Sequence, residues 1–191
     1  MKIENKQNIS GDELYRRFLS GDDGAFEDFV KMYEDSLSRY IYGIVQDYHE
    51  AEHLTIETFS QLVFNTKSFD GKSCIKTYLF AIGKNLSFQV LKKRGREKHL
   101  PFEEAATIPE DESKTPHSFL EKEENKHCLQ KAMQGLKEEY HAVLVLLYFE
   151  DMSYIQAGRA MNKSEKQIKN LAHRAKVALK KKLEDNGYTY Y

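Results

Sequence analysis

Two groups of polar side chains in this sequence have the types and the spacing needed to bind nucleic acid. The first follows Ser164, where amide and basic side chains share the exposed face of a predicted helix. Asn and Gln side chains can pair with adenine, and Lys or Arg with guanine or phosphate. The first turns of such a helix read base edges in a major groove. The residues expected on this surface are Ser164, Glu165, Lys166, Gln167, Lys169, Asn170, His173 and Arg174.

The second group lies on a helix predicted over residues 75–94. Lys76, Phe80 and Lys84 recur every fourth residue, with Asn85 beside them. A cation, a flat ring and an amide on one face suit stacking on unpaired bases and clamping of their phosphates. Alternatively, Phe80 is half-buried core and the lysines are an ordinary solvated face, and periodicity does not choose between the two. The basic residues Lys92, Lys93 and Arg94 extend the group, and the turn Asp70, Gly71, Lys72 and Ser73 precedes it, either capping the helix or presenting a pocket to a flipped base.

Nothing in the sequence suggests catalysis. There is no phosphate-binding glycine loop, no HExxH string, and no clustered nucleophile and base. Cys74 and Cys128 lack CxxC spacing, so we expect two plain, buried or half-buried thiols, and neither a metal nor a cofactor. The seven histidines are scattered along the chain, which favours surface or linker positions.

Charge is distributed very unevenly along the chain, although the formal net charge is only -1. From Glu97 to Glu124 there are nine carboxylates against three lysines, whereas from Lys163 to Lys182 eight cations face one carboxylate. A basic end therefore stands beside an acidic middle.

The proline positions divide the chain. All three prolines fall within residues 101–116, inside the acidic stretch. Proline breaks helices, so we expect a flexible acidic linker at residues 96–122 between helical domains at residues 10–95 and 123–187. No stretch is long and apolar enough for a membrane span, and the N-terminus lacks the apolar core of a signal peptide, so a cytoplasmic protein without membrane insertion is expected.

Helical periodicity runs through both predicted domains, and β alternation is hard to find, so the fold class expected is all-α. Ser10 and Ser73 are candidate caps for helices in the first domain. In the second domain an apolar helix ends near Phe149, Ser153 and Ser164 can each cap a helix, and Asn162 can make the tight turn between them. The layout is that of a helix-turn-helix.

The order of these segments resembles the extracytoplasmic-function (ECF) sigma factors of the sigma-70 superfamily across residues 12–183. The matching strings are Gly21-Asp22 with Ala25-Phe26 and Tyr33; Glu50-Ala51-Glu52-His53-Leu54 through Glu57-Thr58-Phe59; Phe69 through Lys76-Thr77-Tyr78-Leu79 to Asn85-Leu86 and Arg96; Met152-Ser153-Tyr154; and Ser164-Glu165 through Ile168-Lys169 to His173-Arg174-Ala175.

The resemblance implies that the chain directs promoter recognition and DNA melting as part of transcription initiation. Its partners would be core RNA polymerase and promoter DNA, as duplex and as melted single strand; whether an anti-sigma factor also binds is left open. The loop and helix from Asp70 to Arg94 would recognise the minus-ten element, and the last helix the minus-thirty-five element. The residues implied for polymerase binding are Glu52, His53, Ile56, Glu57 and Phe59.

Several positions depart from the family pattern. His53 and Ile56 stand where Asp and Gln are usual, and Tyr78 where Trp is common. In the helix-turn-helix, Gln156-Ala157-Gly158 replaces a usual Glu-Ile-Ala, and Lys163 occupies a commonly apolar turn position, so we expect a less stable C-terminal domain. The alternative function is a conventional helix-turn-helix regulator that does not bind core polymerase.

Overall fold

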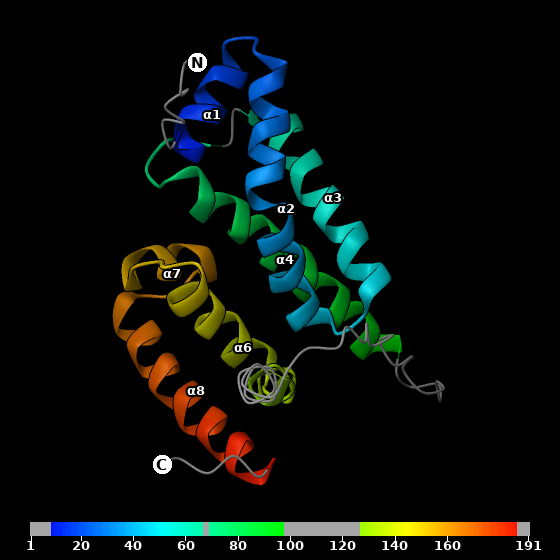
Figure 1. Cartoon of the computed structure of the whole chain (residues 1–191), viewed down its shortest axis with the longest axis vertical. Helices are drawn as coiled ribbons and strands as arrows, with labels where there is room; N and C mark the ends of the chain where they lie inside the picture. Colours follow the sequence, from blue (N-terminus) through cyan, green and yellow to red (C-terminus); the bar gives the residue numbers. More distant parts are fainter. Residues whose placement is uncertain (1–8, 67–68, 98–126, 187–191) are drawn as a thin grey trace, which may run out of the picture.

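The computed structural model describes residues 9–66, 69–97 and 127–186, and every regular element within them is a helix (Figure 1). This confirms the all-α prediction. The predicted acidic linker lies outside the described residues from residue 98 onward.

Four helices form the first half of the described chain: α1 (Gly11–Leu19), α2 (Asp23–Val45), α3 (Tyr48–Phe64) and α4 (Ile75–Glu97). A short polar side chain caps three of them. Ser10 accepts a hydrogen bond from the backbone N–H of Glu13 at 3.2 Å, as predicted, while Asp22 and Asp47 cap α2 and α3 in the same way. These caps satisfy N–H groups that have no partner inside the helix.

The start of α4 differs from the prediction. Instead of Ser73, Asp12 of α1 accepts a hydrogen bond from the backbone N–H of Ile75 at 2.8 Å. Because the partner comes from a distant part of the chain, local spacing could not have identified it. The cap fixes the first turn of α4 against α1.

Aromatic rings fill the core between α1, α2 and α3. Tyr15, Phe29 and Phe59 are buried, and the centroids of Phe29 and Phe59 lie 6.3 Å apart with nearly perpendicular planes. Edge-to-face pairs of this kind add to the free energy gained by burying the rings. The core thus holds α3 firmly on α2.

The second half contains a helix over residues 127–134, then α6 (Glu138–Leu144), which continues as the π-helical turn η2 (Val145–Phe149), then α7 (Tyr154–Met161) and α8 (Glu165–Asp185). Ser153 and Ser164 each form a capping box, and Asn162 adopts the left-handed conformation at φ 54°. The predicted helix-turn-helix is confirmed at all three positions.

Gly158 has a structural reason to be glycine. A Cβ atom there would lie 2.6 Å from the backbone carbonyl oxygen of Lys163. The N–H of Lys163 in turn donates a hydrogen bond of 2.8 Å to the carbonyl of Gly158. The departure from the usual helix-turn-helix string therefore allows a close approach of backbone to backbone in the turn.

The two halves pack against each other, which the sequence did not predict. Figure 1 shows α7 lying along α4 and α6 close to the end of α2. Where α6 meets α2, the imidazole of His141 fills the space that a side chain at position 43 would occupy: a Cβ on Gly43 would lie 1.8 Å from its Cε1 atom. His141 is buried, contrary to the surface or linker position expected for it.

Candidate nucleic-acid interface

The predicted base-reading face of α8 is exposed. All eight residues expected on it are exposed, while Ile168, Leu171 and Ala172 are buried on the opposite side. The amphipathic pattern therefore gave the correct face. An exposed helix start with amide and basic side chains has the form required to enter a major groove.

Gln167, one of the residues of α8 predicted to contact bases, already forms a hydrogen bond within the protein. The side-chain oxygen of Gln167 accepts a hydrogen bond of 2.8 Å from the backbone N–H of Ser164, and the Ser164 hydroxyl accepts one from the N–H of Gln167. The carbonyl oxygen of Gln167 is thus committed to the helix cap. Only its amide nitrogen is left to donate to a base or phosphate.

Two tyrosines lie beside the lysines of α8, and sequence reasoning missed both. Lys169 lies 5.6 Å from the ring centroid of Tyr154 and forms an ion pair of 2.5 Å with Glu165, which raises the pKa of the lysine. Lys176 lies 4.8 Å from the ring centroid of Tyr148. The i to i+4 spacing of Glu165 and Lys169 was a readable signal for the ion pair.

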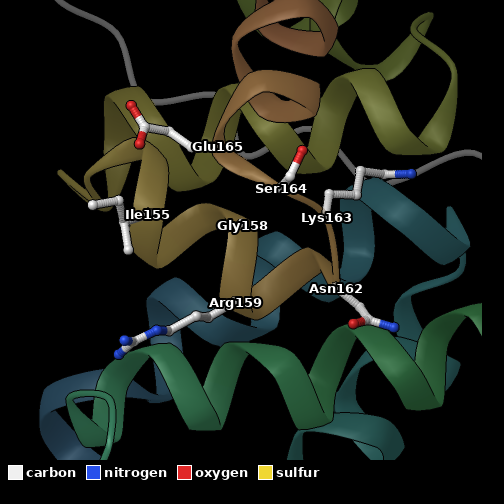
Figure 2. A pocket seen from close by; sticks show the side chains of 7 residues that line it. All are labelled: Ile155, Gly158, Arg159, Asn162, Lys163, Ser164 and Glu165. Carbon is white, nitrogen blue, oxygen red and sulfur yellow. The ribbon is translucent and has the colours of Figure 1, made fainter.

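A shallow hollow of about 420 Å³ lies between α7 and the start of α8. In Figure 2, Ile155 and Glu165 border one side of it, whereas the side chain of Arg159 extends away from them toward α4. The guanidinium of Arg159 donates a hydrogen bond to the backbone carbonyl of Lys72. This side of α7 is therefore turned toward the first half of the chain.

The face of α4 predicted to bind unpaired bases is largely covered. Phe80 is completely buried, with its ring centroid 5.2 Å from that of Tyr40. The prediction of an exposed Phe80 was wrong, because α2 packs on that side of α4 and takes the ring into the core. The alternative, in which Phe80 belongs to the core, is the correct one.

Lys76 forms an ion pair with the other half of the molecule. Its ammonium lies 2.9 Å from a carboxylate oxygen of Glu150 and donates a hydrogen bond of 2.8 Å to the backbone carbonyl of the same residue. The side chains of Lys76 and Glu150 are 28% and 9% exposed. Because this pair is shielded from water, it is screened less by salt than a surface pair.

Lys84, Asn85 and Lys92 line one wall of a cleft of about 370 Å³, and Glu139 and Met161 line the other. Asn85 and Lys92 are exposed to this cleft, and Lys84 is half-buried. Burial lowers the pKa of Lys84, with the nearby charge of Lys163 acting in the same direction and Glu139 opposing it. The cleft thus places a carboxylate from α6 beside the cations of α4.

Arg94 forms ion pairs within the first half of the chain. Its guanidinium lies 3.1 Å from carboxylate oxygens of both Asp47 and Glu50, and it donates a hydrogen bond of 3.2 Å to the carbonyl of Val45. Carboxylates at the start of α3 therefore already engage the guanidinium, and the predicted DNA contact at Arg94 stays a prediction. Lys92 and Lys93 remain exposed.

The loop before α4 is a compact turn. The Asp70 carboxylate accepts a hydrogen bond of 3.1 Å from the N–H of Lys72 and lies 2.9 Å from the Lys72 ammonium, which lowers the pKa of Asp70. Gly71 lies between them at φ 71°, a conformation that favours glycine. Ser73 is half-buried beside them and does not cap α4 through its own side chain.

The outer face of α3 carries the residues predicted to contact polymerase. Glu52, His53 and Ile56 are exposed and Glu57 is half-buried. Phe59 is only 7% exposed and packs in the aromatic core, so its prediction as a contact residue was wrong. Two further large side chains of α3, those of Tyr48 and Phe64, are 64% and 84% exposed, and sequence reasoning did not single them out.

Comparison with known proteins identifies the family. The family model for sigma-70 region 2 matches residues 29–97, and that for sigma-70 region 4 matches residues 126–179. The ECF RNA polymerase sigma factor SigW of Bacillus subtilis is 30% identical over 178 residues, covering 89% of this chain and 95% of SigW. The chain belongs to the ECF sigma factors. The RNA polymerase sigma-H factor of Pseudomonas aeruginosa is 26% identical, covering 90% of this chain and 93% of that protein.

Two solved structures share the fold of this ECF sigma factor. The sigma factor RpoE of Bartonella quintana, in complex with the anti-sigma factor NepR, has a TM-score of 0.66 and 21% identity, covering 83% of this chain and 96% of RpoE. CnrH, in complex with the cytosolic domain of CnrY, has a TM-score of 0.64 and 19% identity, covering 92% of this chain and 97% of CnrH.

Three further features of this ECF sigma factor concern metal binding, the cysteines and membrane spanning. Within residues 9–66, 69–97 and 127–186, no group of three or more His, Cys, Asp or Glu side chains could hold a metal ion. Cys74 and Cys128 are free and half-buried, as predicted. None of the helices in these ranges is long and apolar enough to cross a bilayer.

Proposed function

We propose that this ECF sigma factor, which directs RNA polymerase to promoters, divides the task among the outer faces of α3, α4 and α8. The observation that carries the proposal is the pairing, in one chain, of matches to region 2 and region 4 with an exposed base-reading face on α8. A conventional regulator would not need the region 2 match, so that alternative is not favoured. The two domains would act as separate modules at residues 10–95 and 123–187, joined by the linker at residues 96–122.

Region 4 would read the minus-thirty-five element through α8. We keep eight exposed residues on this surface, and their exposure supports the assignment: Ser164, Glu165, Lys166, Gln167, Lys169, Asn170, His173 and Arg174. Asn170 and Arg174 have uncommitted polar ends suited to base edges, whereas Lys166 and Lys169 suit phosphates. Contacts of the second kind make binding salt-dependent.

Region 2 would hold the melted minus-ten strand on α4 and the preceding turn. The residues that we keep in this role are Asp70, Gly71, Lys72, Ser73, Lys76, Lys84, Asn85, Lys92 and Lys93. Lysines along one side of a helix suit a single-stranded backbone, and the Asn85 amide suits a base edge. Arg94 also stays in the proposal, with its guanidinium shared between DNA and the carboxylates of Asp47 and Glu50, whereas the buried Phe80 is left out.

Core polymerase would bind the outer face of α3, through Glu52, His53, Ile56 and Glu57. We add Tyr48 and Phe64, because large apolar side chains this exposed commonly mark an interaction surface. Such a protein acts where core polymerase is found, in the cytoplasm. An anti-sigma factor is a further proposed partner, in view of the RpoE complex with NepR.

In vitro transcription tests the proposal. Core polymerase, the purified chain and fragmented genomic DNA are combined, and RNA start sites are mapped. We expect a small set of starts that share two upstream elements and depend on the added chain. An Ile56→Glu, Phe64→Glu variant should lose them, whereas a Lys31→Glu variant on α2 should keep them. Duplex binding by the chain alone, with no start selected by holoenzyme, would instead point to the conventional regulator.

A further inference from the structure

We propose that the DNA-binding surface extends along one flank of α8, where Tyr154 and Tyr148 hold the ammonium groups of Lys169 and Lys176 in position to contact promoter phosphates. The two tyrosines would be positioning residues, because they act through the lysines. Neither tyrosine nor Lys176 is among the residues proposed to read the minus-thirty-five element. The inference rests on that proposed role of α8 and adds how its cations are held.

Lys169 and Lys176 lie on the same side of α8. They are seven residues apart, which is close to two full turns of an α-helix, and His173 lies between them. All three side chains are exposed. Seven residues span about 10 Å along the helix axis, whereas one DNA strand offers a phosphate about every 3.4 Å along the duplex axis. The two ammonium groups can therefore reach different phosphates.

Each of these lysines lies beside a ring from a different element. Tyr154 is the first residue of α7, directly after the Ser153 cap, and its ring centroid lies 5.6 Å from Nζ of Lys169. Tyr148 belongs to the π-helical turn η2, and its ring centroid lies 4.8 Å from Nζ of Lys176. Both distances are within the range of about 6 Å for cation–π attraction. A π-helical turn is rare and frequently occurs at a functional site.

The two tyrosines are not part of the core. The exposed fractions of Tyr154 and Tyr148 are 37% and 49%. A hydrogen bond with the side chain of Tyr148 raises the pKa of Lys176, and one with the Glu165 carboxylate raises the pKa of Lys169. Both lysines are therefore fully charged at neutral pH, on a face that is open to a partner.

A ring holds a lysine for DNA better than a carboxylate does. The free side chain of a lysine samples many rotamers, and ordering it on binding costs free energy. Glu165 also orders Lys169, but its carboxylate competes with a phosphate for the same ammonium. The neutral ring of Tyr154 limits the rotamers while the ammonium keeps its charge for the phosphate.

Four variants of the full chain test whether the rings hold the lysines. Tyr154→Leu and Tyr148→Leu remove a ring but keep an apolar side chain, and Tyr154→Phe keeps the ring without the hydroxyl. Phe149→Leu is the matched control, because this ring is 59% exposed and no lysine of the described ranges lies over it. In NMR spectra, ring currents should displace the ε-methylene signals of Lys169 and Lys176. Each tyrosine-to-leucine variant should lose this displacement only at its own lysine.

The second readout is the affinity of the holoenzyme for a promoter found in the start-site assay, measured over a range of salt concentrations. Tyr154→Leu and Tyr148→Leu should each bind about two- to fivefold more weakly, as expected for a cation–π contact at an exposed site. The slope of log affinity against log salt concentration should stay unchanged, because no charge is removed. Tyr154→Phe and Phe149→Leu should bind as the original chain does.

A double-mutant cycle separates positioning from direct contact. In the Lys169→Ala background, Tyr154→Leu should cause no further loss of affinity. A further loss, or a loss in Tyr154→Phe equal to that in Tyr154→Leu, would mean that the tyrosine contacts DNA itself and would overturn the inference. Undiminished promoter affinity or unchanged lysine signals in the leucine variants would overturn it too. These results concern only the tyrosines, whereas a holoenzyme that selects no start would refute the sigma function.

Discussion

His141 should make this protein lose stability in mild acid. The imidazole is 7% exposed, and among the described residues its Nδ1 atom has no hydrogen-bond partner. Burial lowers its pKa from 6.5 to about 4. Arg39 and Glu150 line the adjacent groove, but burial is the cause of the shift. Unfolded chains therefore bind a proton at this residue more readily than folded chains do.

The size of the effect follows from linkage. Stability is fully present above the unfolded pKa of about 6.5 and falls as the pH drops toward the folded pKa. Between neutral pH and about pH 5, the unfolded state binds nearly one more proton, which costs about 2 kcal/mol of unfolding free energy. Below about pH 4 both states are protonated and the loss levels off at about 3 kcal/mol.

A comparison of the original chain with His141→Gln isolates this contribution, because the other titrating groups are common to both. Urea unfolding would be measured for each protein at neutral pH and at about pH 5. We expect the stability difference between them to shift by about 2 kcal/mol in favour of the variant in acid. NMR titration of the His141 ring should give a pKa near 4. A constant stability difference, together with an ordinary ring pKa, would refute the buried neutral imidazole.

Gly158→Ala should lower the unfolding free energy by about 1–2 kcal/mol in thermal denaturation, because the clash with the Lys163 carbonyl outweighs the gain of about 1 kcal/mol in helix propensity; a stabilised variant would contradict this. Arg94→Ala should lower the unfolding free energy by only about 1 kcal/mol, because its ion pairs with Asp47 and Glu50 are partly exposed. Lys93→Ala should leave the unfolding free energy almost unchanged, and equal losses in the two variants would contradict a stabilising role for these ion pairs. Asn85→Ala should reduce open-complex formation while holoenzyme assembly is unchanged, and equal loss of both would remove Asn85 from the DNA surface. Lys169→Ala should weaken holoenzyme binding to a mapped promoter and reduce the slope of log affinity against log salt concentration by about one. If the variant and the original chain have the same affinity at every salt concentration, Lys169 does not contact a phosphate.

Local chemistry predicted the helix-turn-helix closely. Ser153 and Ser164 cap the helices that follow them, and Asn162 makes the left-handed turn, because each feature depends on only a few neighbouring residues. The buried and exposed faces of α8 were equally readable, since only one side of that helix packs on the protein.

Helix α4 was harder to predict because α2, α3 and α7 all pack on it. Periodicity identifies one apolar stripe, but it does not reveal what covers the remaining faces. Phe80 went into the core beside Tyr40, and Arg94 was engaged by carboxylates more than forty positions away in the chain. The surface or linker position expected for His141 was wrong for the same reason, since the space that holds its ring depends on Gly43 in the other half.

Because the backbone N–H of Ile75 donates a hydrogen bond to Asp12, the position of the first turn of α4 depends on a residue of α1. Helix α1 precedes the span matched by the region 2 family model, yet its carboxylate anchors the first turn of the helix proposed to hold the melted strand. If α4 holds the melted strand as proposed, we expect Asp12→Ala to change which bases are accepted although it removes no proposed DNA contact. A search for specificity determinants confined to the DNA-facing residues would overlook this contact between α1 and α4.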